Sequence, residues 1–202
     1  ATVYLPPCIS AFVGADITTA LLASGIYARA DAAMLVDIGT NGEMALAEKG
    51  RILCCSTAAG PAFEGAGISD GMVATDGAIR HLKLCPEKKD LTYETISDKE
   101  IKGICGSGIL DAVAIFVEQG LITYSGRITN EAPSFLSKLV NDEESKITFA
   151  GTNVSITQED IRQVQLAKAA ILAGCRTLLE DNKCDCSRVE VLYLCGGFGS
   201  FL

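Results

Sequence analysis

Short apolar runs alternate with glycine-rich turns through the first quarter of the chain. Apolar residues from Ala32 to Val36 lead into Asp37 and the turn Gly39-Thr40-Asn41-Gly42, and apolar residues resume at Met44. Glycine and asparagine tolerate the positive φ of tight turns, so the pattern predicts an antiparallel hairpin. A turn at Gly50 and a strand over residues 51–56 would extend the hairpin to a three-stranded meander.

Helical periodicity occurs in three places. Asp16 is expected to cap a helix over Ile17–Ser24 that Gly25 ends. Ser107 is expected to cap a second helix, whose apolar residues recur at i, i+4, i+7 and i+8 until Gly120. The longest helix is predicted to begin at residues 157–160 and to carry an apolar stripe to about Asp181.

The remaining apolar segments are short and predict strands. The run Val189–Cys195 is β-branched and aromatic, which is typical of a buried parallel strand, and Cys8–Val13 also predicts a buried strand. Residues 68–100 are interpreted as a strand-rich insertion with short segments at 72–74, 78–84 and 91–96; we also expect a short helix over 134–140 and strands at 147–149 and 154–156.

Composition narrows the classes of protein to which the chain can belong. It has 202 residues, 49% hydrophobic and 21% charged, so it can build a core as one large or two small domains. The net charge of −8 argues against nucleic acid and an anionic membrane surface as partners. No apolar run of about 18 residues occurs, so no membrane-spanning helix is predicted.

The nine cysteines do not follow a metal-binding pattern. Several lie in apolar runs, where a free thiol behaves as a small hydrophobic group. Cys54-Cys55 and Cys184-Asp185-Cys186 are the only close pairs, and neither belongs to a four-ligand array. We therefore expect reduced thiols, no iron–sulfur cluster in this chain, and a cytoplasmic setting such as that of an anaerobe.

Three glycine-rich turns could hold an anion or a nucleotide. The backbone amides around Thr40 suit a phosphate, and Asp37 at the end of its strand suits Mg²⁺ held through water. Gly106-Ser107-Gly108 lies at a helix N-terminus, and Gly196-Gly197 follows a strand's carboxyl end, where ligands of α/β sheets bind. The alternatives are an ordinary surface hairpin and an ordinary capped helix.

Two further features are less informative. The loop around Phe63-Glu64 is interpreted as either a positioned loop or a plain connector. His81, the only histidine, has no acid beside it in the sequence, so a catalytic role is not expected.

Taken in order, these motifs resemble the second half of the actin-like, ribonuclease H-like ATPase fold shared by acetate and sugar kinases, heat-shock chaperones and actin. Within that superfamily the chain is most similar to the reductive activators of corrinoid proteins. The resemblance implies an α/β lobe whose mixed sheet joins the three-stranded meander to parallel strands flanked by helices. The strings that carry it are Leu5-Pro6-Pro7, Phe12-Val13-Gly14-Ala15-Asp16, Asp37-Ile38-Gly39-Thr40-Asn41-Gly42-Glu43, Ala59-Gly60-Pro61-Ala62-Phe63-Glu64-Gly65-Ala66, Ile104-Cys105-Gly106-Ser107-Gly108, Gln165-Leu166-Ala167-Lys168-Ala169 and Gly196-Gly197-Phe198-Gly199.

The resemblance also implies an activity and a partner. Such proteins couple ATP binding and hydrolysis to an electron transfer that reduces Co(II) to Co(I) on a corrinoid protein of a methyltransferase system. ATP and Mg²⁺ are the implied ligands. The implied roles are catalysis by Asp37 and Thr40, with Mg²⁺ near Asp37, and nucleotide binding by Gly39, Asn41, Gly42, Glu64, Gly106, Ser107, Gly196, Gly197, Phe198 and, from the other lobe, Asp16.

The chain departs from the full family pattern, which shapes the expected domain organisation. Only one Asp-Gly-Thr hairpin is present, a cluster-binding cysteine array is absent, and the helix expected after Phe198 is missing. Residues 1–30 are interpreted as the end of the first lobe with a connecting helix, and 31–202 as the second, nucleotide-binding lobe. We expect electron transfer to reside elsewhere and the isolated chain to bind Mg-ATP weakly.

Other functions remain open from the sequence. A small-molecule kinase of the same superfamily is one, because its catalytic acid would come from the first lobe. A non-catalytic, actin-like interaction module whose partners are switched by nucleotide is another. The oligomeric state, including a homodimer, is also left open by the sequence.

Overall fold

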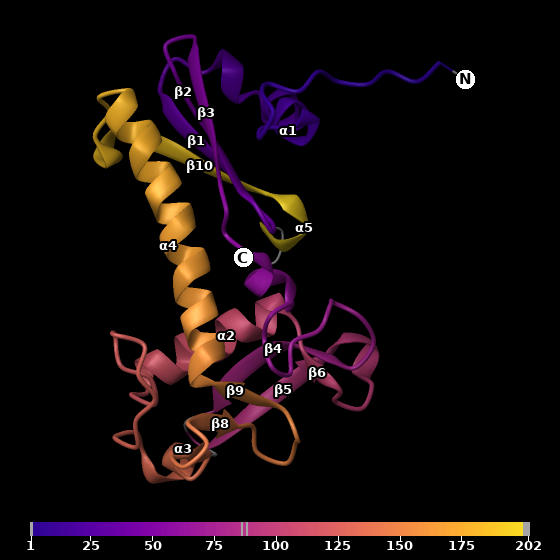
Figure 1. The fold of residues 1–202 in the computed structure, drawn as a ribbon, viewed down its shortest axis with the longest axis vertical. Coiled ribbons are helices and arrows are strands. Elements are labelled where there is room, and N and C mark those ends of the chain that lie inside the picture. Colours follow the sequence, from indigo (N-terminus) through magenta and orange to yellow (C-terminus); the bar gives the residue numbers. More distant parts are fainter. Residues whose placement is uncertain (1, 86, 88, 200–202) are drawn as a thin grey trace. The chain divides into compact units, whose positions relative to one another are not determined.

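The computed structural model describes residues 2–85, 87 and 89–199 (Figure 1). It divides into two compact units: unit 1 comprises residues 1–59 and 168–202, and unit 2 comprises residues 60–167. Helix α4 (Gln158–Asp181) contributes residues to both. The predicted division of the chain into two lobes at residue 30 stays a prediction. Residues 1, 86, 88 and 200–202, which belong to the predicted lobes, lie outside the described part of the chain.

Unit 1 is built on a four-stranded mixed sheet. The strand order is β10 (Val189–Cys195), β1 (Ala32–Ile38), β2 (Gly42–Glu48) and β3 (Arg51–Thr57). Strands β1, β2 and β3 are antiparallel, and β10 runs parallel to β1. The predicted meander and the mixed sheet are therefore confirmed.

Helices cover both faces of this sheet, which explains why its central strands are apolar at nearly every position. Alternate residues such as Leu35 and Ala45 pack with Ile17 and Leu21 of α1 (Ala15–Ser24). On the opposite face, residues such as Met34 and Leu46 pack with Leu178 and its neighbours on α4. Burial of both faces removes the polar alternation that a half-exposed sheet shows.

Two glycines let α4 lie close to strand β2. A Cβ at Gly174 would lie 2.4 Å from Sδ of Met44, and a Cβ at Gly42 would lie 3.1 Å from Cγ1 of Ile171. Met44 is fully buried between them. The lack of side chains at both positions thus permits the close approach of helix and strand.

Some predictions for unit 1 were wrong. Strand β10 is not buried, because its only partner among the described strands is β1 and its alternate residues are exposed, with Leu192 at 56%. The segment Cys8–Val13 forms no strand and makes only an isolated bridge between Ser10 and Val13. The hairpin turn uses no positive φ at Gly39 or Asn41.

The first helix begins differently from the prediction. Gly14, not Asp16, occupies the N-cap position, and no side chain caps the helix. Asp16 lies in the first turn, where Oδ1 accepts a hydrogen bond from the amide of Ile17 at 2.8 Å. Gly25 ends the helix in the left-handed conformation, as predicted.

Unit 2 contains two three-stranded sheets. Strands β5 (Asp90–Thr95), β4 (Ala78–Cys85) and β6 (Gly103–Ile104) form the first, against which helix α2 (Gly106–Glu118) packs (Figure 1). The second sheet comprises β7 (Val140–Asn141), β8 (Lys146–Thr148) and β9 (Ser155–Thr157). The shorter helical segments of the chain are η1 (Ile26–Ala28), η2 (Pro61–Glu64), η3 (Ile96–Asp98), α3 (Ser134–Ser137), η4 (Cys186–Arg188) and α5 (Gly196–Gly199).

Three aromatic rings join the elements of unit 2. Phe149 stacks on Tyr93 of β5, with ring centroids 5.7 Å apart, and meets the edge of Phe116 of α2 at 5.8 Å. Phe116 and Phe149 are both fully buried. The stacking places one strand of the first sheet, helix α2 and the end of β8 around one core.

Residues 68–100 are strand-rich, and two predictions within unit 2 need correction. Residues 72–74 form no strand; only an isolated bridge joins Gly71 to Ile104. The helix expected over 134–140 ends at Ser137 and is followed by β7.

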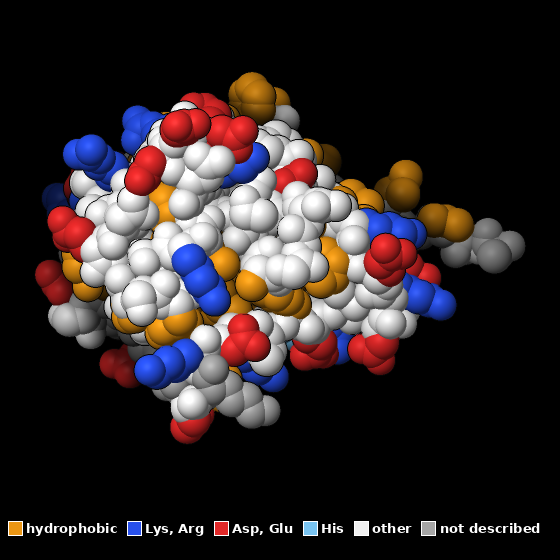
Figure 2. Space-filling model, turned by 90° about the horizontal axis from the view of Figure 1, so that it is seen from below, with side chains coloured by type: hydrophobic (Ala, Val, Ile, Leu, Met, Phe, Trp, Pro, Cys, Tyr) orange, Lys and Arg blue, Asp and Glu red, His pale blue; other side chains and the backbone are white. Residues whose placement is uncertain are grey.

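The surface carries mixed charge. Figure 2 shows acidic and basic side chains interspersed with small apolar groups over the face that it presents. Within the described residues, every helix is too short or too polar to cross a bilayer.

Candidate functional site

The candidate site of unit 1 lies where two parallel strands end side by side. Asp37 near the carboxyl end of β1 is the register neighbour of Cys195, the last residue of β10. After Ile38, the last residue of β1, the chain enters the hairpin loop, and directly after Cys195 it enters α5. The two glycine-rich segments that the sequence singled out are thus brought together at one edge of the sheet.

Gly196 lies against the carboxylate of Asp37. Its φ is 82°, a conformation that glycine adopts at little cost, and a Cβ there would lie 2.4 Å from Oδ1 of Asp37. Both the backbone angle and the lack of space therefore require glycine at this position. The next residue, Gly197, has open space around its missing side chain.

Three carboxylates influence one another at this end of unit 1. Asp37 faces Glu43 across the hairpin register, and Asp16 lies in the first turn of α1. Burial raises the pKa of Asp37, and the negative charge of Asp16 raises it further. The pKa of Glu43 is raised by burial and then by Asp16 and Asp37.

This arrangement suits a bound cation that acts through water. A cation near Asp37 would relieve the repulsion between the carboxylates. Among the described residues no three Cys, His, Asp or Glu side chains are grouped to hold a metal directly. The residues present therefore fit a water-mediated Mg²⁺ better than a fully liganded metal.

The hairpin loop is short and internally bonded. Ile38 pairs with Gly42, and the amide of Gly39 donates to the carbonyl of Asn41 at 3.1 Å. Gly42 is buried, and its carbonyl accepts a hydrogen bond from the hydroxyl of Thr57 at 3.2 Å. In this conformation the exposed part of the loop is Thr40-Asn41, while Gly39 and Gly42 shape the turn.

The predicted adenosine contacts lie on the short helix α5. Gly197 is exposed and Phe198 is half-buried. Helix α5 packs against β1, the strand that carries Asp37. Unit 1 therefore holds Asp16, Asp37, the hairpin loop and the Gly196–Phe198 segment together.

Glu64, Gly106 and Ser107 belong to unit 2. Glu64 is an exposed residue at the end of η2, a turn anchored by the buried side chains of Ala62 and Phe63. This anchoring favours the positioned loop over a plain connector. Gly106 is buried and Ser107 is half-buried at the start of α2.

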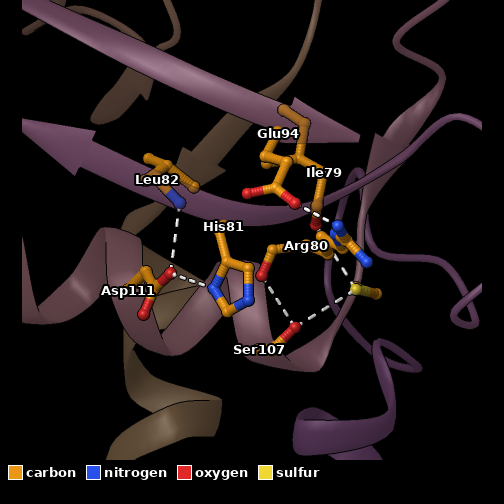
Figure 3. Close-up of polar contacts among 8 residues, drawn as sticks. Ile79, Arg80, His81, Leu82, Glu94, Ser107 and Asp111 are labelled. Carbon is orange, nitrogen blue, oxygen red and sulfur yellow. Dashed lines mark hydrogen bonds and ion pairs between the residues drawn. The ribbon is translucent and has the colours of Figure 1, made fainter. Parts of the chain in front are cut away.

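Ser107 does not cap its helix, contrary to the prediction. The N-cap residue is Cys105, without a side-chain cap, and the Ser107 hydroxyl instead donates to the carbonyl of Arg80 at 2.8 Å (Figure 3). Gly108 explains the closeness of helix and strand, because a Cβ there would lie 2.4 Å from the carbonyl oxygen of Ile79.

The sequence reasoning missed a histidine–carboxylate pair. Nδ1 of His81 on β4 lies 3.0 Å from Oδ2 of Asp111 on α2, and both side chains are partly buried (Figure 3). His81 has no acid beside it in the sequence, but the fold places the Asp111 carboxylate against its ring, and the expectation that His81 is not catalytic stays a prediction. One signal was available: Asp111 follows Ser107 by four residues and so lies on the same face of the helix.

A family model matches residues 31–202: the C-terminal domain of RACo, the ASKHA domain. Two curated proteins match almost the whole chain. The corrinoid activation enzyme RamQ of Eubacterium limosum is 39% identical over 100% of this chain and 35% of its own length. The [Co(II) methylated amine-specific corrinoid protein] reductase of Methanosarcina barkeri is 31% identical over 99% of this chain and 38% of its own length.

A solved structure agrees with these matches. The structure named reductive activator for corrinoid, iron–sulfur protein is similar with a TM-score of 0.84 and 34% identity, over 97% of this chain and 32% of that one. The chain thus spans about a third of the length of each relative.

Proposed function

The chain belongs to the family of RACo C-terminal ASKHA domains, and on that basis we propose that it is the ATP-binding and ATP-hydrolysing lobe of a corrinoid reductive activator. The full activator would reduce a Co(II) corrinoid protein to Co(I). The names of the relatives support this role, since they describe a corrinoid activation enzyme, a Co(II) corrinoid protein reductase and a reductive activator. The electron-carrying iron–sulfur domain would lie outside residues 1–202.

The contact between Gly196 and Asp37 is the observation that carries the nucleotide-binding part of the proposal. It joins the end of β10 to the start of the hairpin at one edge of the sheet. Ligands of α/β sheets bind outside the carboxyl ends of parallel strands, which is where both residues lie.

In the proposed reaction the protein acts by positioning. Asp37 would hold Mg²⁺ through water or orient the attacking water, and Thr40 with the hairpin loop would hold the β- and γ-phosphates. Mg²⁺, when bound, neutralises charge that develops on the phosphates. Phosphoryl transfer requires placement and charge stabilisation more than a protein nucleophile, so a carboxylate and a hydroxyl suffice.

The adenosine would lie against Gly196, Gly197 and Phe198. Glu64, Gly106 and Ser107 remain predicted nucleotide contacts from unit 2, and Asp16 remains a predicted phosphate-facing residue. Reduction of Co(II) to Co(I) is unfavourable, so a nucleotide-driven change between two conformations would supply the differential affinity that makes it proceed.

The test uses the full gene product that contains residues 1–202, with a Co(II) corrinoid protein, a low-potential reductant and Mg-ATP. The absorption spectrum of Co(I) should appear only with ATP. Asp37→Ala should slow both ATP turnover and Co(I) formation by roughly 100-fold, the scale expected when a positioned charge is removed.

A matched control is Asp31→Asn at the opposite end of the same strand, where the exposed carboxylate pairs only loosely with Arg29 at 3.7 Å. It should leave both rates unchanged. If Asp37→Ala turns over ATP at the normal rate, the catalytic assignment fails; if metabolites are phosphorylated and Co(I) never forms, the kinase alternative replaces the proposal.

A further inference from the structure

Strand β4 carries a β-bulge at Arg80. Ile79 pairs with Thr95 and His81 pairs with Glu94, so Arg80 is an extra residue on this strand. Bulges redirect the groups of the bulged residues and often occur beside functional sites. Here the Arg80 carbonyl is directed to α2, while its guanidinium forms an ion pair with Glu94 (Figure 3).

Beyond the end of strand β6, helix α2 and its N-cap residue form the hydrogen bonds to this edge of β4. Strand β6 pairs with β4 only at Ala78 and Ile79. Beyond these residues, groups of α2 and its N-cap bond to β4 instead. The amide of Cys105 donates to the carbonyl of Ile79 at 3.1 Å, Ser107 donates to that of Arg80, and the amide of Leu82 donates to Oδ2 of Asp111 at 3.1 Å.

Asp111 makes the strongest of these contacts. Its Oδ2 atom accepts from the Leu82 amide and lies 3.0 Å from Nδ1 of His81 (Figure 3). A carboxylate only accepts hydrogen bonds, so Nδ1 carries the proton in this pair. Hydrogen bonds to an ionised group are about twice as strong as neutral ones.

Ser107 and Asp111 are one helical turn apart on the same face of α2, so together they fix the rotation of the helix about its axis. Gly108 adds a steric limit at Ile79 between them. The first turn, Gly106–Gly108, thereby acquires a defined orientation relative to β4.

We propose that Asp111 and His81 are positioning residues that hold the first turn of α2 in the orientation required to bind nucleotide. This inference rests on the proposed function, in which Gly106 and Ser107 contact the nucleotide. Asp111 and His81 act through the helix and need not touch ATP. Their loss should therefore weaken ATP binding without changing the chemical step.

The test measures KM and kcat for ATP hydrolysis, and the dissociation constant for Mg-ATP, in the full gene product. His81→Leu removes the donor, whereas His81→Asn retains an N–H donor near the position of Nδ1. We expect His81→Leu and Asp111→Ala to raise KM and the dissociation constant by roughly tenfold, equivalent to one charge-assisted hydrogen bond. His81→Asn should recover most of the affinity, and kcat should stay unchanged in all three.

Glu94→Gln is the matched control, because it breaks the ion pair on the β5 side of the same bulge without touching α2. Its KM should equal that of the wild type. Equal KM values for wild type, His81→Leu and Asp111→Ala would overturn the inference, and so would a fall in kcat with unchanged KM. If the wild-type protein does not bind Mg-ATP, the proposed function itself fails, and the inference fails with it.

Discussion

Gly196 approaches Asp37 so closely that no side chain fits between the two residues. A Cβ at Gly196 would lie 2.4 Å from the Asp37 carboxylate, and the left-handed φ of 82° independently favours glycine. The relationship links two residues that are 159 positions apart in the chain (196 minus 37). Two segments that form the candidate site are thus held in one fixed contact.

Gly196→Ala should destabilise unit 1 by about 1–3 kcal/mol, the scale of one residue held in an unfavourable conformation. Thermal or urea unfolding measures the loss. Gly197→Ala is the matched control, since its missing side chain meets nothing within 4 Å, and its stability should match the wild type. Equal stability of the two variants would show that the Asp37 side chain can move away from a Cβ at position 196 without loss of stability.

Asp37→Asn should raise stability at neutral pH while it abolishes the proposed ATP turnover. The folded protein holds the pKa of Asp37 above its ordinary value, so the native state binds more protons than the unfolded state between the two pKa values. Stability contributed by the protonated form is therefore lost as pH rises through the raised pKa.

Asparagine at position 37 cannot ionise, so the Asp37→Asn variant does not lose stability in this way as pH rises. Its melting temperature should exceed that of the wild type at pH 7, and the difference should vanish at a pH below the ordinary value of 3.8. A lower melting temperature for Asp37→Asn at pH 7 would contradict the interpretation that burial and Asp16 destabilise this carboxylate.

Gly174→Ala should destabilise the contact between α4 and β2. Alanine ordinarily favours a helix by about 1 kcal/mol over glycine. Here its Cβ would lie 2.4 Å from Sδ of the fully buried Met44, and overpacking of a core costs about 1–3 kcal/mol. The net effect should be a loss, measurable by chemical unfolding.

The double variant Gly174→Ala with Met44→Ala identifies the cause. If the clash with Met44 is responsible, the two changes should be less destabilising together than the sum of the single changes. Additive losses would place the cause elsewhere.

Tyr93 should ionise only in strongly alkaline solution. Burial raises the pKa of its phenol to about 12. The folded state therefore retains this proton between about pH 10 and pH 12, where the unfolded state loses it, and stability falls as pH rises through that range. Ultraviolet titration of the phenolate should show one of the five tyrosines ionising near pH 12.

Tyr93→Phe serves as the comparison, because it keeps the ring that stacks on Phe149 and removes the ionisable group. It should lack the late ionisation and the alkaline loss of stability. A variant that unfolds at the same alkaline pH as the wild type would assign the alkaline transition to another group.

Local periodicity predicted which helices and strands form better than it predicted how deeply each of them is buried. The meander, α4 and the parallel strand β10 follow from apolar spacing, because secondary structure is encoded over a few residues. The burial of β10 was overestimated, since an apolar composition does not reveal whether a strand has one neighbour or two.

The main limit on predicting the candidate site was that its hydrogen-bond partners lie far apart in the sequence. Ser107 suits a helix cap locally, yet its hydroxyl bonds to Arg80, 27 residues earlier. The pairing of His81 with Asp111 spans 30 residues and depends on a bulge that no local pattern announces. The sequence indicated that Gly196 follows a strand's carboxyl end, but it did not identify Asp37 as its neighbour.

The register of β10 against β1 places a thiol beside the candidate site. Cys195 is the neighbour of Asp37, and its pKa is raised by burial and by the charge of that carboxylate. Neutralisation of Asp37, by substitution or by a bound cation, would make the thiol more acidic and therefore faster to alkylate. The alkylation rate of Cys195 should therefore report whether the Asp37 carboxylate is charged.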